Sequence, residues 1–175
     1  MSDESRRKRR QQQTRETIVR AFSQLMLERH YGAITVAEVV VRADVGRSTF
    51  YEHFPTKLDL LRAALAMPFT PLAEAVTESA PGLLYWVHHF RENQALARVL
   101  FAEPTRRVLY RTLADLIEAR LPAGLSLPGG IVAAQVAAAQ MALLEPWTLG
   151  QSALPAEAVA LAMQKSSRAL VAAAL

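Results

Sequence analysis

The sequence predicts an all-α protein, and three observations lead to this prediction. Apolar side chains recur at the three- and four-residue spacing of a helix, first at Ile18, Phe22 and Leu25. No stretch alternates between polar and apolar residues over a useful length, so we expect no strands. Prolines such as Pro104 and Pro155 stand where helices can begin, because the first helical position tolerates a missing N–H.

The first predicted helix starts near Thr14 and ends before Gly32. Thr35 and Glu38 then have the spacing of a capping box, which predicts that a second helix starts at Thr35. This second helix is short, because the sequence Asp44-Val45-Gly46 interrupts it. Aspartate tolerates turn and left-handed backbone geometry, and Gly46 can cap the helix that follows.

The third predicted helix runs from Arg47 to Phe54 and stops at Pro55. A cap-like signal at Thr56 opens a fourth helix that extends to about Met67. Further helices are expected at 71–79, 81–92, 94–101, 104–120, 129–149 and 155–173. The predicted architecture has about nine helices in total.

Charge is distributed unevenly along the chain. Residues 1–62 contain 12 basic and 8 acidic side chains, whereas residues 63–175 contain 8 of each. The whole net charge of +4 therefore belongs to the N-terminal third. This asymmetry indicates a polyanionic partner at one end of the molecule.

Several classes of protein are excluded by composition. The absence of cysteine excludes disulfides, thiolate metal ligands and a cysteine nucleophile, and favours a reducing cytoplasm. No apolar region follows the basic run at 6–10, so this run is not a signal peptide. The most apolar stretch, 131–144, is shorter than the roughly 20 residues of a membrane span. We expect a soluble cytoplasmic protein with no membrane partner.

An enzyme is not expected. The seven glycines form neither a dinucleotide fingerprint nor a phosphate loop. Glu74 and Glu78 lie four residues apart, as on a solvated helix face. His88 and His89 point in different directions, and no further ligand stands at a useful spacing. We therefore predict no catalytic residues, no cofactor and no metal site.

The motif that indicates function is the helix, tight turn and helix at residues 35–54. Phe50 and Phe54 are four residues apart and can anchor the second helix to its neighbours. A helix held in this way can enter the major groove of DNA. Its exposed side chains are donors with one aromatic ring, namely Arg47, Ser48, Thr49, Tyr51 and His53.

The run from Ala43 to Leu61 (ADVGRSTFYEHFPTKLDLL) resembles the DNA-binding signature of the TetR family of transcriptional repressors. The resemblance is specific over about residues 12–65 and concerns only length and helical architecture beyond them. Two positions depart from the family pattern: Asp44 stands where glycine is common, and Gly46 stands where serine is usual. Both residues can adopt the backbone conformation required.

This resemblance implies an organisation and a set of DNA contacts. Residues 1–13 would form a flexible basic arm, 14–62 the helix-turn-helix domain, and 63–175 a helical domain for effector binding and dimerisation. Phosphate contacts are implied for Thr35 and Lys57, base or phosphate contacts for Arg47, Ser48 and Thr49, and backbone or thymine-methyl contacts for Tyr51 and His53. The arm residues Arg6, Arg7, Lys8, Arg9 and Arg10 either add phosphate contacts or form a solubilising tail.

The last two helices resemble the pair that forms a dimeric four-helix bundle in the family, since small residues allow close helix packing. The candidate dimer residues are Gly130, Ala134, Ala138, Ala142, Val159 and Met163; the alternative is an ordinary intrachain core. The middle helices would hold a hydrophobic or aromatic effector. Its candidate contacts, which could equally be core residues, are Trp86, His89, Phe90, Phe101, Tyr110, Met141 and Trp147.

These features together predict a homodimeric repressor that binds a near-palindromic operator and is released by a small-molecule effector. The alternative is an architectural protein that binds DNA of any sequence and has no ligand sensor. The roughly 110 apolar-rich residues after the motif argue against this alternative, because compacting DNA does not need them.

Overall fold

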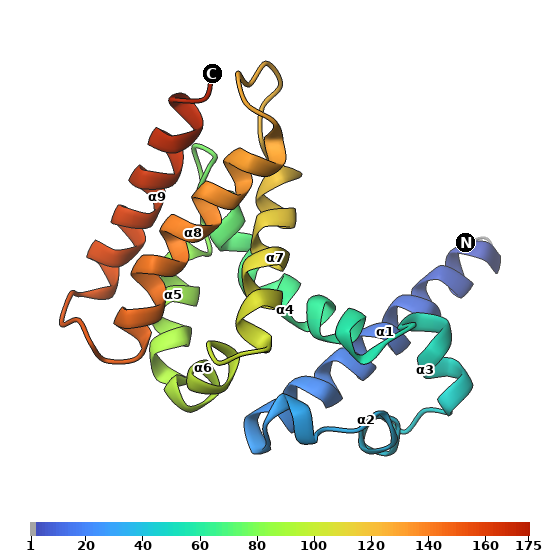
Figure 1. Cartoon of the computed structure of the whole chain (residues 1–175). Coiled ribbons are helices and arrows are strands. Elements are labelled where there is room, and N and C mark those ends of the chain that lie inside the picture. The colour runs from blue at the N-terminus through green and yellow to red at the C-terminus, as the bar shows by residue number, and fades with distance from the viewer. Residues whose placement is uncertain (1–2) are drawn as a thin grey trace. The chain divides into compact units, whose positions relative to one another are not determined.

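The computed structural model describes residues 3–175, which divide into two compact units with the boundary between Ala64 and Leu65 (Figure 1). The described residues form nine α-helices, one 3-10 turn at Tyr31–Ala33 and no strand, which confirms the all-α fold. The helices are α1 (Asp3–Glu28), α2 (Val36–Ala43), α3 (Arg47–His53), α4 (Lys57–Glu74), α5 (Leu83–Glu92), α6 (Gln94–Leu100), α7 (Thr105–Glu118), α8 (Gly129–Thr148) and α9 (Ala156–Ala172).

The first helix is longer than predicted. It begins at Asp3 rather than near Thr14, so the basic run at 6–10 belongs to α1 and is not a separate arm. The reason is local, because arginine, lysine and glutamine are good helix formers and no glycine or proline interrupts 3–28. Residues 1 and 2 of the predicted arm lie outside the described residues.

The core of the first unit gathers apolar residues from all of its helices. Phe22 of α1, Val39 of α2 and Phe50 of α3 are completely buried, as are Leu60 and Leu61 of α4. These contacts fix the short helices α2 and α3, which are too short to be stable alone. The core therefore determines how the helix-turn-helix motif is presented.

The predicted turn between α2 and α3 is confirmed. Thr35 and Glu38 form the capping box at the start of α2. Asp44 ends α2 in the left-handed conformation with φ of 52°, and Gly46 is the N-cap of α3. Both departures from the family pattern are thus compatible with the turn geometry.

The predicted break near Met67 is wrong. The structure continues α4 through Pro68 and Pro71 to Glu74, and the helix expected at 71–79 is absent. Each proline removes one helical N–H. Leu65, Phe69 and Leu72 are nevertheless buried on one face of α4, and this burial maintains the helix across both prolines.

In the second unit α8 packs between α7 and α9, and α5 contacts both α8 and α9 (Figure 1). Gln140 is fully buried here and donates to the carbonyl of Leu72 at 2.9 Å and to the hydroxyl of Ser167 at 2.8 Å. No helix within residues 3–175 is both long enough and apolar enough to span a membrane.

Candidate nucleic-acid interface

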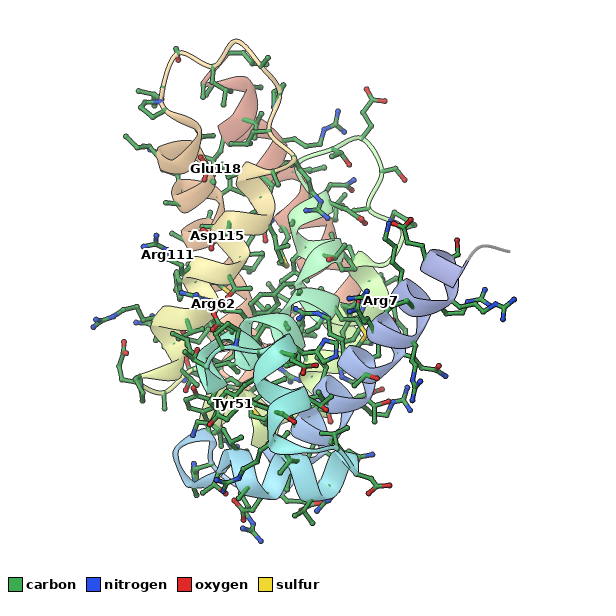
Figure 2. All side chains as sticks on the ribbon, turned by 90° about the vertical axis from the view of Figure 1, so that its right-hand side faces the viewer. Arg7, Tyr51, Arg62, Arg111, Asp115 and Glu118 are labelled. Carbon is green, nitrogen blue, oxygen red and sulfur yellow. The ribbon has the colours of Figure 1, made fainter. Side chains whose placement is uncertain are left out.

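α3 presents a polar face that carries the predicted reading residues. Arg47 and Ser48 are exposed, and Tyr51, one turn further on, is 52% exposed (Figure 2). Within residues 3–175 these three side chains make no hydrogen bond or ion pair, so their polar groups can bind a ligand. Thr49 and His53 on the same helix are half-buried.

The opposite face of α3 is anchored in the core. Phe50 is 0% and Phe54 is 1% exposed, and their ring centres lie 6.0 Å apart. The predicted anchoring role of these two rings is confirmed. The anchored face and the polar face together leave α3 rigidly held with donors pointing outward.

The C-terminal end of α3 is held by Arg15, a residue that the motif analysis missed. Its guanidinium donates to the carbonyl of His53 at 3.0 Å and lies 4.3 Å from the centre of the Phe54 ring. A signal was present in the sequence: Arg15 extends the apolar stripe of Ile18 and Phe22 toward the N-terminus. A cation on a stripe that faces the core needs a partner there.

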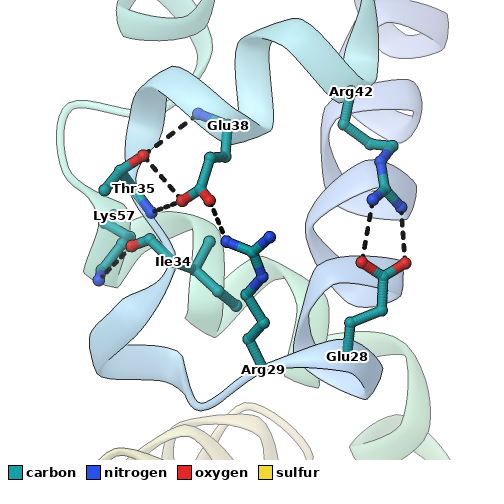
Figure 3. Close-up of polar contacts among 7 residues, drawn as sticks. All are labelled: Glu28, Arg29, Ile34, Thr35, Glu38, Arg42 and Lys57. Atoms are coloured by element: carbon teal, nitrogen blue, oxygen red, sulfur yellow. Dashed lines mark hydrogen bonds and ion pairs between the residues drawn. The ribbon is translucent and has the colours of Figure 1, made fainter.

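Thr35 is occupied as a helix cap. Its backbone N–H and its hydroxyl donate to Oε2 of Glu38 at 2.8 and 2.9 Å, and its hydroxyl accepts from the Glu38 N–H (Figure 3). Both donors that we expected to bind a phosphate are therefore engaged with Glu38, and the phosphate contact of the exposed Thr35 stays a prediction. The N–H groups of Val36 and Ala37 precede any helical acceptor and remain the donors at this helix start.

Lys57 also differs from the prediction. Its ammonium donates to the carbonyls of Tyr31 at 2.9 Å and Ile34 at 2.8 Å, and it lies 4.3 Å from the centre of the Tyr31 ring. Burial lowers the pKa of Lys57 below its usual value. The cation therefore joins the start of α4 to the turn before α2, and it does not point outward to a phosphate.

Two ion pairs join α1 and the residues after it to α2 (Figure 3). Arg42 binds both carboxylate oxygens of Glu28, at 2.9 and 3.0 Å, and Arg29 pairs with Glu38. The hydrogen bond from Arg42 lowers the pKa of Glu28, and hydrogen bonds from Thr35 lower the pKa of Glu38. Both carboxylates thus stabilise the position of α2.

The basic residues 6–10 are exposed on the first turns of α1 (Figure 2, Arg7). Lys8 pairs with Glu4 at 2.8 Å, with both side chains 75% exposed. An open groove lies between this part of α1 and the end of α3, lined by Lys8, Gln11, Gln12, Arg15, Glu52 and His53.

The predicted effector residues fall into two groups in the second unit. Trp86, His89 and Phe90 are half-buried neighbours on α5, with the rings of Trp86 and His89 4.8 Å apart. Phe101, Met141 and Trp147 are buried, and Tyr110 lies half-buried beneath Arg106. Trp147 is fixed as a core residue, because its indole N–H donates to the carbonyl of Leu154 at 2.7 Å.

No three His, Asp or Glu side chains of residues 3–175 are grouped as a metal ion would require. Three buried side-chain oxygens described in this unit have no hydrogen-bond partner, namely Thr112 Oγ1, Gln140 Oε1 and Thr148 Oγ1.

The predicted dimer residues are divided by burial. The four small residues of α8, namely Gly130, Ala134, Ala138 and Ala142, are exposed. Val159 and Met163 of α9 are 0% exposed, so the prediction that they contact a second chain is wrong. They face α8 and the core of the same unit, whereas Leu161 of α9 is 51% exposed.

A tight helix-turn-helix with an outward donor face, joined to a larger helical unit, defines the class of helix-turn-helix regulatory proteins. Comparison with known proteins shows which proteins resemble the helix-turn-helix unit. Residues 18–64 match the sequence profile described as bacterial regulatory proteins, tetR family. Over these residues the chain is similar to that family.

One curated relative is the HTH-type transcriptional repressor BepR of Brucella suis biovar 1 (strain 1330), which is 30% identical over 105 residues. The match covers 58% of this chain and 49% of BepR, so it spans about half the length of that protein.

Solved structures share the fold over most of the chain. A TetR-family regulator from Streptomyces coelicolor A3 aligns with a TM-score of 0.59 at 18% identity, covering 91% of this chain and 94% of that one. A TetR transcriptional regulator from Streptococcus agalactiae 2603V aligns with a TM-score of 0.57 at 22% identity, covering 94% and 99%. These identities support the fold alone.

Proposed function

We propose that this protein is a cytoplasmic transcriptional repressor that binds double-stranded operator DNA through α3. The observation that carries the proposal is the outward face of α3, where Arg47, Ser48 and Tyr51 make no hydrogen bond or ion pair within residues 3–175. Arginine can bind guanine through two hydrogen bonds, and serine and tyrosine can bind bases or phosphates in the major groove. The exposed cations of residues 6–10 add attraction to the phosphate backbone.

In this proposal the protein acts as a homodimer. Gly130, Ala134, Ala138 and Ala142 recur every four residues on one exposed face of α8, where small side chains permit close approach of a second helix. Ile131 of α8 and Leu161 of α9 are about half exposed and supply apolar area to the same contact. A two-fold axis would place two copies of α3 about 34–36 Å apart and require a near-palindromic operator.

The proposed effector is a hydrophobic or aromatic small molecule bound in the second unit. The aromatic cluster of Trp86, His89 and Phe90 on α5 is half-buried, which suits a flat apolar ligand. Release from DNA would follow a shift of α4, the helix that begins in one unit and continues into the other. The effector must bind the shifted state more tightly by a few kcal/mol.

Selection of a random duplex pool by the purified chain at near-physiological salt tests this function. Enrichment of an inverted repeat is the expected result. Binding that enriches no sequence and only weakens as salt rises would favour the alternative, an architectural DNA-binding protein without a sensor. The unpartnered donors of α3 support sequence reading over this alternative.

A further inference from the structure

The backbone carbonyls in the last turn of α3 lack hydrogen-bond donors from within the helix. The helix has seven residues, and its last turn must find donors outside the helix. The Phe54 N–H donates to the Phe50 carbonyl at 2.8 Å, but Pro55 has no N–H to give to Tyr51. The next amide, that of Thr56, donates to the carboxylate of Asp59 at 3.1 Å. The chain that follows α3 therefore does not continue its hydrogen-bonding pattern.

Arg15 supplies a donor at this point from a different helix. Its Nη1 lies 3.0 Å from the carbonyl oxygen of His53, the last residue of α3. Its guanidinium also lies over the Phe54 ring, whose side chain is 1% exposed. The two contacts involve consecutive residues and different chemistry, so they restrict both the position and the orientation of the helix end. A cation there is also favourable for the helix dipole.

We infer that Arg15 is a positioning residue for DNA reading: it holds the C-terminal end of α3 so that Arg47, Ser48 and Tyr51 meet the bases in one pose. This inference rests on the proposed DNA-binding function. Arg15 is half-buried and its guanidinium is engaged within the protein, which distinguishes it from the exposed cations of residues 6–10. Its contribution is rigidity of α3, because a reading constellation must be held to within about 0.5 Å.

The first test uses the free protein and needs no DNA. Amide hydrogen exchange is measured along α3 in the wild type, in Arg15→Met and in Arg20→Met. Arg20 is the matched control, since it is exposed on α1 and makes no polar contact within residues 3–175. We expect amide exchange at residues 50–54 to accelerate about tenfold in Arg15→Met, because a hydrogen bond from a charged group is lost. Exchange at these residues should stay unchanged in Arg20→Met. Equal exchange in all three proteins would overturn the inference.

The second test uses the duplex that the wild type enriches from a random pool. We expect Arg15→Met to weaken binding about tenfold while the slope of log affinity against log salt is unchanged, because no phosphate contact is lost. Arg15→Lys keeps the charge but cannot both reach the His53 carbonyl and cover the Phe54 ring, so it should not restore affinity. Thermal melting by circular dichroism checks that each variant is folded.

A different set of binding results would indicate that Arg15 contacts a DNA phosphate. A slope that falls by about 0.9 in Arg15→Met, with affinity restored by lysine, would identify a phosphate contact and overturn the positioning role. If the wild type enriches and binds no duplex, the proposed function fails. The exchange measurement would then still decide whether Arg15 holds α3.

Discussion

Phe50 and Tyr51 are consecutive residues of α3 with opposite exposure. Phe50 is 0% exposed in the core and Tyr51 is 52% exposed, although their rings meet edge to face at 5.3 Å. Neighbouring positions on one short helix thus differ in burial, and only Tyr51 is available for the proposed DNA contact. Their substitution to alanine can therefore test the two contributions independently.

We expect Phe50→Ala to destabilise the protein by about 3–5 kcal/mol, because it leaves a cavity in the core of the first unit. Tyr51→Ala should cost about 1 kcal/mol or less, the value of an aromatic contact at a partly exposed site, and should weaken binding to the enriched duplex. Chemical denaturation and a binding titration measure the two effects. Equal destabilisation by both variants would contradict the assigned faces of α3.

The motif predicts that Lys57 contacts DNA, whereas in the structure Lys57 is half-buried and its ammonium binds two backbone carbonyls. The carbonyls of Tyr31 and Ile34, at and just after the 3-10 turn, converge on its ammonium in the folded structure. The sequence does not reveal the direction of these carbonyls, so the spacing of the motif could not predict the contact.

Substitution of Lys57 by methionine keeps the aliphatic stem and removes both donors. We expect a loss of about 1–3 kcal/mol in the free energy of unfolding, since two partly buried carbonyls lose their partner. The salt slope of DNA binding should stay the same because no phosphate contact disappears. Unchanged stability with a slope lower by about 0.9 would instead restore the phosphate role predicted from the sequence.

At the scale of elements, α2 is held by carboxylates whose charge depends on pH. The pKa values of Glu28 and Glu38 are both below the usual value of 4.5. Their folded-state pKa values are therefore lower than in the unfolded chain. The stability that they contribute is present above about pH 4.5 and is lost as the pH falls through the lowered values.

The lowered pKa values of Glu28 and Glu38 predict how the stability of the contacts between α1 and α2 depends on pH. As the pH falls below about 4.5, the wild type should lose stability more steeply than the double variant Glu28→Gln/Glu38→Gln, which has no charge to lose at these positions. Denaturation curves at several pH values measure the difference in slope. Parallel curves for the two proteins would mean that the ion pairs in Figure 3 do not contribute.

Local signals predicted some elements correctly and failed at others. The capping box at Thr35 and the Asp44 turn involve residues within a few positions of each other, so the sequence was sufficient. α1 starts earlier than predicted because the helix propensity of its polar N-terminal residues is sufficient to extend the helix to Asp3. The sequence predicts that α4 ends before its prolines, whereas the helix continues to Glu74. The burial of Phe69 and Leu72, which maintains the helix, depends on tertiary packing that local signals do not contain.

At the scale of the whole molecule, the proposed dimer depends on the exposed face of α8. The sequence identified its small residues by their four-residue spacing, and the structure leaves them exposed. Spacing could not separate them from Val159 and Met163, because both sets occur on alanine-rich helices and only packing within the chain decides which is buried.

We expect Ala138→Arg to convert the dimer to a monomer, because a long charged side chain would prevent close approach of the helices. Ala95→Arg on α6 is the control, since this alanine is also exposed but lies outside the α8 face. Sedimentation equilibrium measures the masses. A wild-type monomer, or a dimer that survives Ala138→Arg, would contradict the proposed interface.

The most direct test of the central claim is a second random-pool selection with the triple variant Arg47→Ala/Ser48→Ala/Tyr51→Ala. These side chains are outside the core, so the variant should fold and dimerise like the wild type. If the outward face of α3 reads the bases, the wild type enriches an inverted repeat and the variant enriches none, while weak salt-dependent binding persists. Enrichment of the same repeat by the variant would contradict the account, because the sequence would then be read elsewhere on the protein.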